Sequence, residues 1–306
     1  MRNGRLLLLL LTVQSNNPQP VQGHVMQPES NKTTGILAET ITSIKAALGP
    51  RLDDIAVERV VVGIFFTGVK LTNGQGGLCF TPIKTIPEAV CCPSSARAMP
   101  NSGNLAGTPA AKIIDHMFSG NAMRRAIGIA VMNALSNTIW ADRAPGDYVI
   151  RHNADPLDNY AYPEGGKAVV VGALVPYLKM LKQGNRDFSI LEKDIRTLKP
   201  DEMDHFVPAE HAMEKVAEAD LLIITGTTLI NDTLEDLLAT AKPSADVIVV
   251  GPTASMLPEA FFSRGVNAIG GVMATDPDRL LEVLGEGGSG YHFFGKSADR
   301  VVINKP

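Results

Sequence analysis

Residues 219–238, ADLLIITGTTLINDTLEDLL, carry the clearest structural pattern of this chain. Residues 220–226 form a short apolar run with no polar alternation in its centre, which is typical of a strand buried on both faces of a sheet. After a polar turn, residues 234–241 are predicted to form a helix. A buried strand followed by a helix is the repeating unit of a parallel sheet with helices on both faces.

The same alternation continues on both sides of this stretch. The predicted strands are residues 167–172, 187–191, 220–226, 246–251 and 267–273. The predicted helices are residues 174–182, 209–219, 234–241, 258–263 and 277–284. We therefore expect an α/β domain over residues 155–306, Rossmann-like with a mainly parallel sheet. The order of its strands does not follow from the sequence.

The first half of the chain has a different pattern. Residues 35–48 are predicted to be a helix and residues 57–66 a strand that continues through 68–71. Asn73-Gly74 is a strong hairpin signal, so residues 77–81 are expected to return as a second strand. Residues 123–135 are apolar on nearly every side, as in a buried helix. These features predict a small α+β domain over residues 33–150, and the Pro- and Gly-rich residues 142–166 are expected to be a linker.

Composition excludes several classes of protein. The chain has 306 residues, of which 45% are hydrophobic and 20% charged, as in ordinary two-domain globular proteins. A net charge of −4 disfavours a dedicated nucleic-acid binder, and three cysteines argue against a disulfide-stapled scaffold. No G-x-S-x-G, P-loop or H-E-x-x-H motif is present, so nothing favours a hydrolase, a kinase or a metalloprotease.

The first residues allow two interpretations. Arg2 and Arg5 precede the apolar run 6–11, a pattern that resembles a signal peptide ending near residue 15 or 23. Alternatively, the start is assigned too far upstream and translation begins at Met26, so that residues 1–25 do not belong to the natural protein. Under either interpretation, residues 1–32 are an extension that precedes the folded part. The first interpretation predicts export and the second a cytoplasmic protein. No segment reaches 18 apolar residues, so no membrane span is expected.

A ligand is expected beyond the carboxyl ends of the parallel strands. Gly172 ends the first of them without the G-x-G-x-x-G motif, so NAD or FAD bound in the standard mode is not expected. This glycine either borders a ligand or only eases the turn into a helix. Glu192 ends the second strand, where an acid often bonds a ribose hydroxyl, although a solvated loop carboxylate is the simpler explanation.

Residues 225–233, TGTTLINDT, gather hydroxyl groups and an amide after the third strand. Asp232-x-x-Glu235 fits a capping box with Asp232 as the N-cap. Free backbone N–H groups and hydroxyls together suit an anion or a carboxylate. The alternative is that these residues only cap the helix and complete the turn.

Residues 251–255, GPTAS, follow the next strand and are expected either to line the same pocket or to form a rigid turn. Gly270-Gly271 within the fifth strand suggests close approach of a backbone or a ligand. The candidate ligand-binding residues are Gly172, Glu192, Thr225, Gly226, Thr227, Thr228, Asn231, Thr233, Gly251, Pro252, Thr253 and Ser255.

Cys91 and Cys92 are the candidate metal ligands, with Cys79 as a third thiol. Adjacent thiols suit a soft transition or heavy metal ion, but the paired C-x-x-C spacing of a zinc site is missing, and small buried thiols are common. His205 and His211 lie in an acidic segment, six residues apart, which suits no single helical face.

Taken together, these segments resemble the family described as "putative heavy-metal chelation" domains. The resemblance covers residues 36–304 and rests on VVVGIFFTGVKLTNGQGGLCF (60–80), RRAIGIAVMNAL (124–135), GKAVVVG (166–172), residues 219–238 and VIVVGPTASMLPEAFF (247–262). It implies an enolase N-terminal-like first domain, a Rossmann-like second domain, and a role in heavy-metal handling or corrinoid biosynthesis. It implies no particular reaction.

We therefore hypothesise a protein that binds a small anionic ligand or a metal chelate in a cleft between its domains, with Cys91 and Cys92 as soft ligands from the first domain. The competing hypothesis is an enzyme, a transferase or lyase acting on a tetrapyrrole precursor or a similar anion. Its general acid or base would have to be Glu192, His205 or His211. A third hypothesis is a subunit or chaperone of a metalloenzyme. The sequence does not fix the metal, the ligand or whether the chain forms a homo-oligomer.

Overall fold

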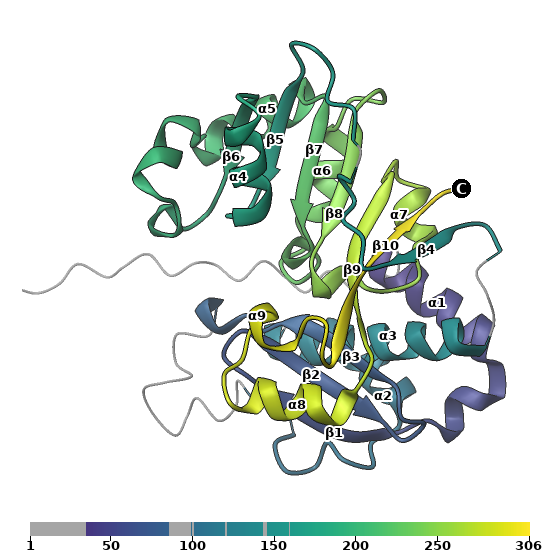
Figure 1. Cartoon of the computed structure of the whole chain (residues 1–306). Coiled ribbons are helices and arrows are strands. Elements are labelled where there is room, and N and C mark those ends of the chain that lie inside the picture. Colours follow the sequence, from purple (N-terminus) through teal and green to yellow (C-terminus); the bar gives the residue numbers. More distant parts are fainter. Residues whose placement is uncertain (1–34, 86–98, 100, 120, 143–145, 159) are drawn as a thin grey trace, which may run out of the picture. The chain divides into compact units, whose positions relative to one another are not determined.

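Two sheets organise the chain (Figure 1). The computed structural model describes residues 35–85, 99, 101–119, 121–142, 146–158 and 160–306, which belong to one unit of contacts, residues 31–306. A sheet of three antiparallel strands forms first, in the order β1-β2-β3. A sheet of seven strands follows, in the order β4-β10-β9-β8-β7-β5-β6.

The centre of the large sheet confirms the expectation of a mainly parallel sheet. Its five parallel strands are short and apolar, and each begins within one residue of its predicted start: β5 (Lys167–Val171), β6 (Asp187–Leu191), β7 (Leu221–Thr225), β8 (Asp246–Val250) and β9 (Ala268–Ala274). The helices that follow these strands are α4 (Val175–Gln183), α5 (Ala212–Glu218), α6 (Leu234–Thr240), α7 (Glu259–Phe262) and α8 (Pro277–Gly285).

The order of the parallel strands reverses between β5 and β7. β6 lies on one side of β5, whereas β7, β8 and β9 follow one another on the other side. The connections from β5 therefore leave in opposite directions, and a crevice opens between the loops after β5 and β7. This is where open parallel sheets bind their ligands.

Two further strands close one edge of the large sheet, and the sequence patterns missed both. β4 (Val149–His152) and β10 (Ala298–Asn304) pair antiparallel with each other, and β10 also pairs antiparallel with β9. The prediction of a linker over residues 142–166 is therefore wrong where β4 lies. β4 is mostly exposed, so it carries none of the apolar runs that mark the buried strands.

The small sheet contains one more strand than expected. Residues 57–71 form β1 (Val57–Val62) and β2 (Phe66–Leu71), which fold back on each other, so the single predicted strand is wrong. The turn is closed by a hydrogen bond from Gly63 N–H to the carbonyl of Phe66, at 3.0 Å. The Asn73-Gly74 hairpin to β3 (Gly76–Phe80) forms as predicted.

One buried helix supports the small sheet from one face. α3 (Ala122–Asp142) packs on β2 and β3, and β3 fits closely because a Cβ atom on Gly77 would clash with the α3 backbone. β3 is an edge strand, and side chains bond its outer edge. Asn133 Nδ2 donates to the carbonyl of Leu78 at 2.6 Å, and Asn137 Nδ2 donates to that of Gly76 at 2.9 Å.

The other face of the small sheet is covered by α8, which follows β9 of the large sheet. Leu281 and Leu284 of α8 occupy the space that a side chain at Gly68 would need. Figure 1 shows α8, in yellow, lying across the strands of the small sheet. The C-terminal part of the chain thus completes the core of the N-terminal part. The domain ranges 33–150 and 155–306, and the likeness of the first to enolase N-terminal domains, stay predictions.

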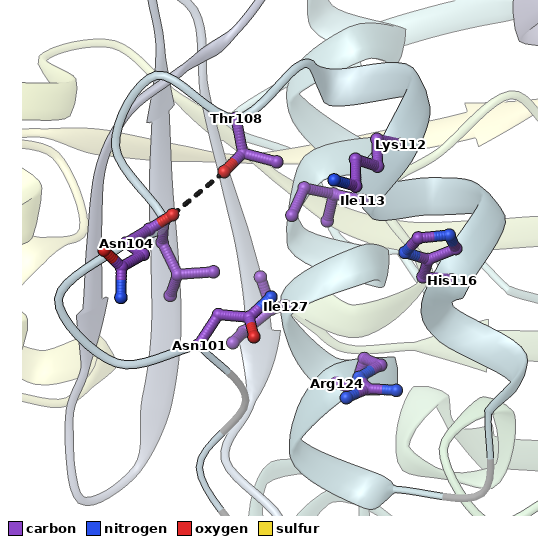
Figure 2. Close-up of a pocket in the computed structure, with 9 residues that line it drawn as sticks. Asn101, Asn104, Thr108, Lys112, Ile113, His116, Arg124 and Ile127 are labelled. Carbon is purple, nitrogen blue, oxygen red and sulfur yellow. Dashed lines mark hydrogen bonds between the residues drawn. The ribbon is translucent and has the colours of Figure 1, made fainter.

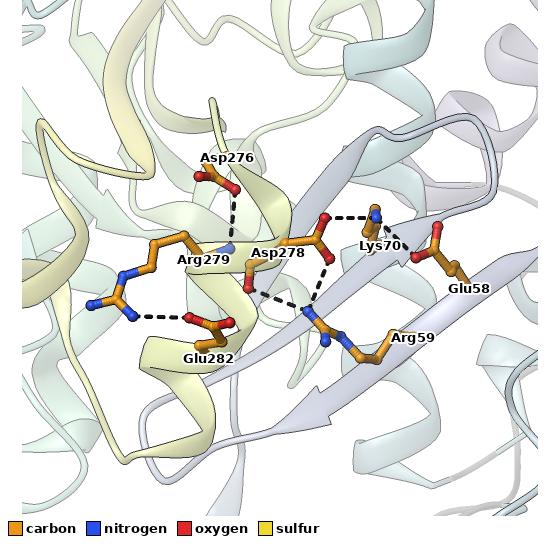
Figure 3. Close-up of polar contacts among 7 residues, drawn as sticks. All are labelled: Glu58, Arg59, Lys70, Asp276, Asp278, Arg279 and Glu282. Atoms are coloured by element: carbon orange, nitrogen blue, oxygen red, sulfur yellow. Dashed lines mark hydrogen bonds and ion pairs between the residues drawn. The ribbon is translucent and has the colours of Figure 1, made fainter.

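A network of charges joins α8 to the small sheet (Figure 3). Lys70 Nζ of β2 lies 2.8 Å from carboxylate oxygens of both Asp278 and Glu58, and Arg59 Nη2 lies 3.2 Å from Asp278. These carboxylates raise the pKa of Lys70, which therefore stays charged. The network fixes the position of α8 from its exposed side.

Candidate functional site

A cavity of about 1060 Å³ opens at the carboxyl ends of β5, β6, β7 and β8. It lies at the reversal of strand order, where Gly172 after β5 faces Thr225 at the end of β7. A Cβ atom on Gly172 would lie 3.0 Å from Cγ2 of Thr225, so the two loops are in contact. The described lining residues are Phe66, Phe80, Lys84, Gly172, Ala173, Leu174, Val175, Glu192, Lys193, Asp194, Arg196, Thr197, Thr225, Gly226, Thr227, Val250, Gly251, Pro252 and Thr253.

Eight of the twelve candidate residues border this cavity. They come from all four of the strand ends singled out in the sequence: Gly172, Glu192, Thr225, Gly226, Thr227, Gly251, Pro252 and Thr253. Their convergence follows from the sheet alone, because parallel strands place their carboxyl ends at one edge.

The other four candidates hold the loops rather than line the cavity. Thr228 Oγ1 donates to the carbonyl of Thr225 at 2.7 Å, and its side chain is buried. Ser255 Oγ accepts from Val272 N–H at 2.7 Å and donates to the carbonyl of Pro252 at 2.9 Å. Both serve the turns that carry the lining residues.

Asn231 and Thr233 also bond within the loop. With its amide group turned to satisfy its neighbours, Asn231 donates to Thr233 Oγ1 at 2.6 Å and to the carbonyl of Thr228 at 3.1 Å. Its oxygen then accepts from Lys193 Nζ at 3.3 Å. Asn231 therefore orients a lysine of the cavity wall and does not itself reach the cavity.

The predicted capping box at Asp232 is wrong. Asp232 has a left-handed backbone, with φ of 58°, and α6 begins after Thr233, whose side chain makes no capping bond. The Asp232 carboxylate instead lies 2.5 Å from Nη1 of Arg125 on α3. Glu235 also serves another element, because its Oε1 accepts at 2.6 Å from Ile36 N–H, the first of α1 (Ile36–Leu48).

Gly172 and Gly251 give the loops a shape that other residues adopt with strain. Their φ angles are 96° and 118°, in the region that favours glycine. Gly270 and Gly271 lie close to other parts of the chain: Cβ atoms there would lie 2.9 Å from Pro156 and 3.0 Å from Ser255 Oγ. The expected close approach at this pair of glycines therefore involves the protein's own chain.

The small sheet forms one wall of the cavity, and the sequence patterns did not predict this. Phe66, Phe80 and Lys84 reach the cavity from β2, from β3 and from the turn after β3. Phe80 N–H donates to Thr253 Oγ1 at 3.1 Å, and Asn133 Nδ2 donates to the carbonyl of Pro252 at 2.9 Å. No local signal announces such contacts between segments more than a hundred residues apart.

Charged side chains gather on the β6 side of the cavity. Glu192 accepts from the N–H groups of Ala173 at 2.8 Å and Asp194 at 2.9 Å, so it ties the β5 loop to the β6 loop. Asp194 is flanked by Arg196 Nε and Lys84 Nζ, each 2.8 Å away, and these cations lower the pKa of its carboxyl. Glu192 is thus a structural carboxylate here, and Asp194 is ionised.

The start of α4 has few backbone N–H groups that are free to bind a ligand. The N–H groups of Leu174 and Val175 bond to the carbonyls of Gly172 and Ala173 at 2.8 and 3.0 Å, and Pro176 has none. The N–H of Ala173 is bonded to Glu192, as described above. The start of α4 therefore offers a ligand no free N–H group at these residues, and side chains are the available partners there. The expected free N–H groups of residues 225–233 stay a prediction.

Two family models match the chain, and both are described as "putative heavy-metal chelation". One matches residues 155–303 and the other residues 45–136, which include the cavity's strand ends and the small sheet. The chain belongs to this family, described as "putative heavy-metal chelation". A protein of Methanocaldococcus jannaschii, named only as uncharacterized, is 32% identical over 184 residues, which are 58% of this chain and 66% of that protein.

Crystal structures of two family members of unknown function share the fold. The protein from Pyrococcus horikoshii superposes with a TM-score of 0.68 at 18% identity, over 88% of this chain and 99% of its own. The protein from Desulfitobacterium hafniense gives 0.62 at 22% identity, over 87% and 98%. At these identities the likeness establishes the fold only.

The described residues around the cavity do not fit a bare heavy-metal ion of the kind that the family's description names. The described lining contains no thiol or imidazole, and among the described residues no three His, Cys, Asp or Glu side chains lie together as metal ligands. Cys79 is fully buried, and burial raises the pKa of its thiol, which disfavours the thiolate that binds metals. Cys91 and Cys92 lie outside the described residues.

The histidines of the acidic segment do not form a site either. His205 stacks on Phe188 at 3.8 Å and bonds through Nδ1 to the carbonyl of that residue at 3.1 Å. His211 is exposed, with Glu214 at 3.7 Å. Neither residue is among those that line the cavity.

In the part of the chain that the structure describes, no helix is long and apolar enough to cross a bilayer.

Proposed function

We propose that this protein binds a small organic anion with an apolar body in the cavity at the carboxyl ends of β5–β8. The observation that carries the proposal is the division of the cavity's wall, which is apolar on one side and cationic on the other. Its volume of about 1060 Å³ is slightly above the range of about 300–1,000 Å³ that is typical of small-molecule sites.

The apolar side would hold the body of the ligand. Phe66 and Phe80 come from the small sheet, and Val250 comes from β8 of the large sheet. Leu174 and Val175 lie at the start of α4. Phe66 and Phe80 pack edge to face, with their ring centroids 6.4 Å apart, so they form one rigid wall. Apolar area removed from water there stabilises a complex by about 25 cal/mol per Å².

The cationic side would hold the charge of the ligand. Lys84 and Arg196 share one carboxylate, that of Asp194. Lys193 is exposed, and no carboxylate among the described residues lies within ion-pair distance of it. The three cations outnumber the carboxylates of Glu192 and Asp194, so the described lining on this side carries excess positive charge. The hydroxyls of Thr225 and Thr227, 3.2 Å apart, add neutral hydrogen-bonding groups at the β7 end.

In this proposal, the heavy metal that the family's description names would be part of the bound ligand. An anionic chelate, with the metal bound by an organic molecule, matches the cavity's charge and its apolar wall. Such a ligand agrees with the expected link to tetrapyrrole or corrinoid chemistry. Direct ligation by Cys91 and Cys92, and catalysis of a transferase or lyase type, remain separate hypotheses, because no described lining residue supports either.

The test compares native and denatured masses of protein purified without oxygen and without chelator. We expect a native mass excess that corresponds to an organic anion or its metal complex. The same measurement on Lys193→Glu should show the excess reduced or lost. Lys296→Glu is the matched control, since Lys296 is also exposed and does not line this cavity.

Titration with 2-naphthoate, a carboxylate on a two-ring apolar body, provides a second readout. Loss of a charge-assisted contact of about 1.5–3 kcal/mol predicts a Kd at least tenfold higher in Lys193→Glu than in Lys296→Glu. Equal affinities in the two variants would contradict the proposed site. Saturable binding that needs no cationic residue of the wall would also contradict it.

A further inference from the structure

A second cavity lies in the N-terminal part of the chain, apart from the strand ends of the large sheet. It has a volume of about 290 Å³ and shares no described lining residue with the first. It opens between the loop 101–108 and three helical segments: α2 (Ala110–Asp115), the single turn His116–Phe118 and the start of α3. Its lining residues are Asn101, Asn104, Leu105, Thr108, Lys112, Ile113, His116, Arg124 and Ile127.

Nitrogen donors gather on one side of this cavity. Figure 2 shows Lys112, His116 and Arg124 on the helical side, each from a different segment. None of the described lining residues is a carboxylate. The neighbouring Asp115 is held by Lys45, at 2.7 Å, and does not neutralise the cavity. Two permanent positive charges and an imidazole therefore face this space.

The opposite side supplies neutral polar groups from a loop that is well anchored. Figure 2 places Asn101, Asn104 and Thr108 across from the cationic side chains. Thr108 Oγ1 donates to the carbonyl of Asn104 at 3.0 Å, which folds the loop on itself. Val57 N–H bonds to the carbonyl of Thr108 at 2.9 Å, so the loop is fixed to the start of β1. A fixed loop presents its amides without a large cost in conformational entropy.

The base of the cavity is apolar. Ile113 and Ile127 are buried, and both line the cavity together with Leu105. Arg124 is held in position because its guanidinium donates to Ser119 Oγ. A ligand that fits this arrangement has a charged group toward Lys112 and Arg124 and a small apolar part toward the isoleucines.

We propose that this second cavity binds the phosphate group of a small phosphate monoester. The guanidinium, the ammonium, the imidazole and two amides offer more donors than a carboxylate can accept, whereas the oxygens of a phosphate dianion can use them. The volume, which equals roughly ten water molecules, suits a small molecule rather than a nucleotide chain.

Methyl NMR of isoleucine-labelled protein tests this assignment with three probes. Phenyl phosphate, benzoate and inorganic phosphate are titrated separately at fixed pH and ionic strength. We expect phenyl phosphate to give saturable shifts at Ile113 and Ile127, with no shift at Ile223, which is buried in β7. Benzoate, with the same ring and a carboxylate, should bind at least tenfold more weakly.

Variants separate this site from the first cavity. Lys112→Glu and His116→Ala change exposed side chains, so the fold should survive, and each should raise the Kd for phenyl phosphate about tenfold. Lys193→Glu, which alters the first cavity, should leave that Kd unchanged. Shifts at Ile113 and Ile127 that do not saturate would overturn the proposal, as would shifts that persist equally in Lys112→Glu. Equal affinity for benzoate would overturn the choice of phosphate.

Discussion

Asn133 links the two sheets at the cavity, and its replacement by alanine gives a quantitative test of that role. Its Nδ2 donates to the carbonyl of Leu78 at 2.6 Å and to that of Pro252 at 2.9 Å. Asn137, one turn later on α3, bonds a single carbonyl, that of Gly76. Both side chains are buried, and both have an Oδ1 atom without a partner.

The second asparagine makes a matched control. Asn137→Ala and Asn133→Ala each remove an equal volume, an unpartnered Oδ1 atom and one bond to the edge of β3. An unpaired buried carbonyl costs about 1–3 kcal/mol, so we expect Asn137→Ala to lower the free energy of unfolding by about 2 kcal/mol. Asn133→Ala also loses the bond to Pro252 and a longer bond, of 3.4 Å, to the carbonyl of Thr253. Together these are worth about 1 kcal/mol net, because the Pro252 carbonyl keeps the bond from Ser255 Oγ.

The difference is measurable by urea unfolding and by calorimetry. For a chain of this size, about 1 kcal/mol corresponds to roughly 1–2 °C in Tm. Asn133→Ala should therefore melt roughly 1–2 °C below Asn137→Ala, and it alone should weaken binding of 2-naphthoate, because Pro252 lines the cavity. If Asn133→Ala is as stable as Asn137→Ala and binds like the parent, the bond to Pro252 does not join the small sheet to the cavity.

Three further predictions follow from single residues. The Asp194 carboxyl should have a pKa below the usual value of about 3.9, so its ion pairs should be lost only as the pH falls through this lowered pKa. In a ¹³C NMR titration, Arg196→Gln should raise the pKa of Asp194 more than Lys84→Gln does, because Arg196 is the larger cause of the shift. An unshifted pKa in the parent protein would refute this. Gly172→Ala should destabilise the fold by about 1–3 kcal/mol through strain at φ 96°, measured by urea unfolding, and an unchanged midpoint would count against the loop geometry. Cys79 should resist iodoacetamide in the native protein and react in urea, because burial raises the pKa of its thiol; rapid native alkylation would contradict its burial.

The sequence predicted those strands and helices that carry the pattern of apolar residues expected of a buried segment. The five parallel strands are short apolar runs because helices or neighbouring segments cover both faces of the sheet, and that burial requires apolar residues at every position. β4 has no such run, since the edge of the sheet leaves most of its side chains exposed. The turn between β1 and β2 was missed because Ile64 and Phe65 there are apolar yet exposed, which hides the break in the pattern.

The residues of the candidate site likewise fall into those that the sequence predicted and those that it missed. Residues at the carboxyl ends of strands were found because the parallel sheet itself brings them together. Phe66, Phe80 and Lys84 were missed, since their place in the cavity depends on how the small sheet docks, and that docking uses buried bonds such as the one between Phe80 and Thr253. The capping box failed because Glu235 bonds the start of α1, a partner 199 residues away in the chain.

The sign of the charge in the first cavity bears on how a family linked to heavy metals would use it. A free divalent cation at the β6 side would be repelled by Lys84, Lys193 and Arg196, while Asp194 is already occupied by two of them. Interactions of this kind reach several kcal/mol near a protein surface at separations of about 4 Å. An anionic complex would instead be attracted by these three cations, and its apolar part could also pack against the apolar wall. These charges therefore support the proposal that the cavity binds an anionic ligand rather than a free metal ion.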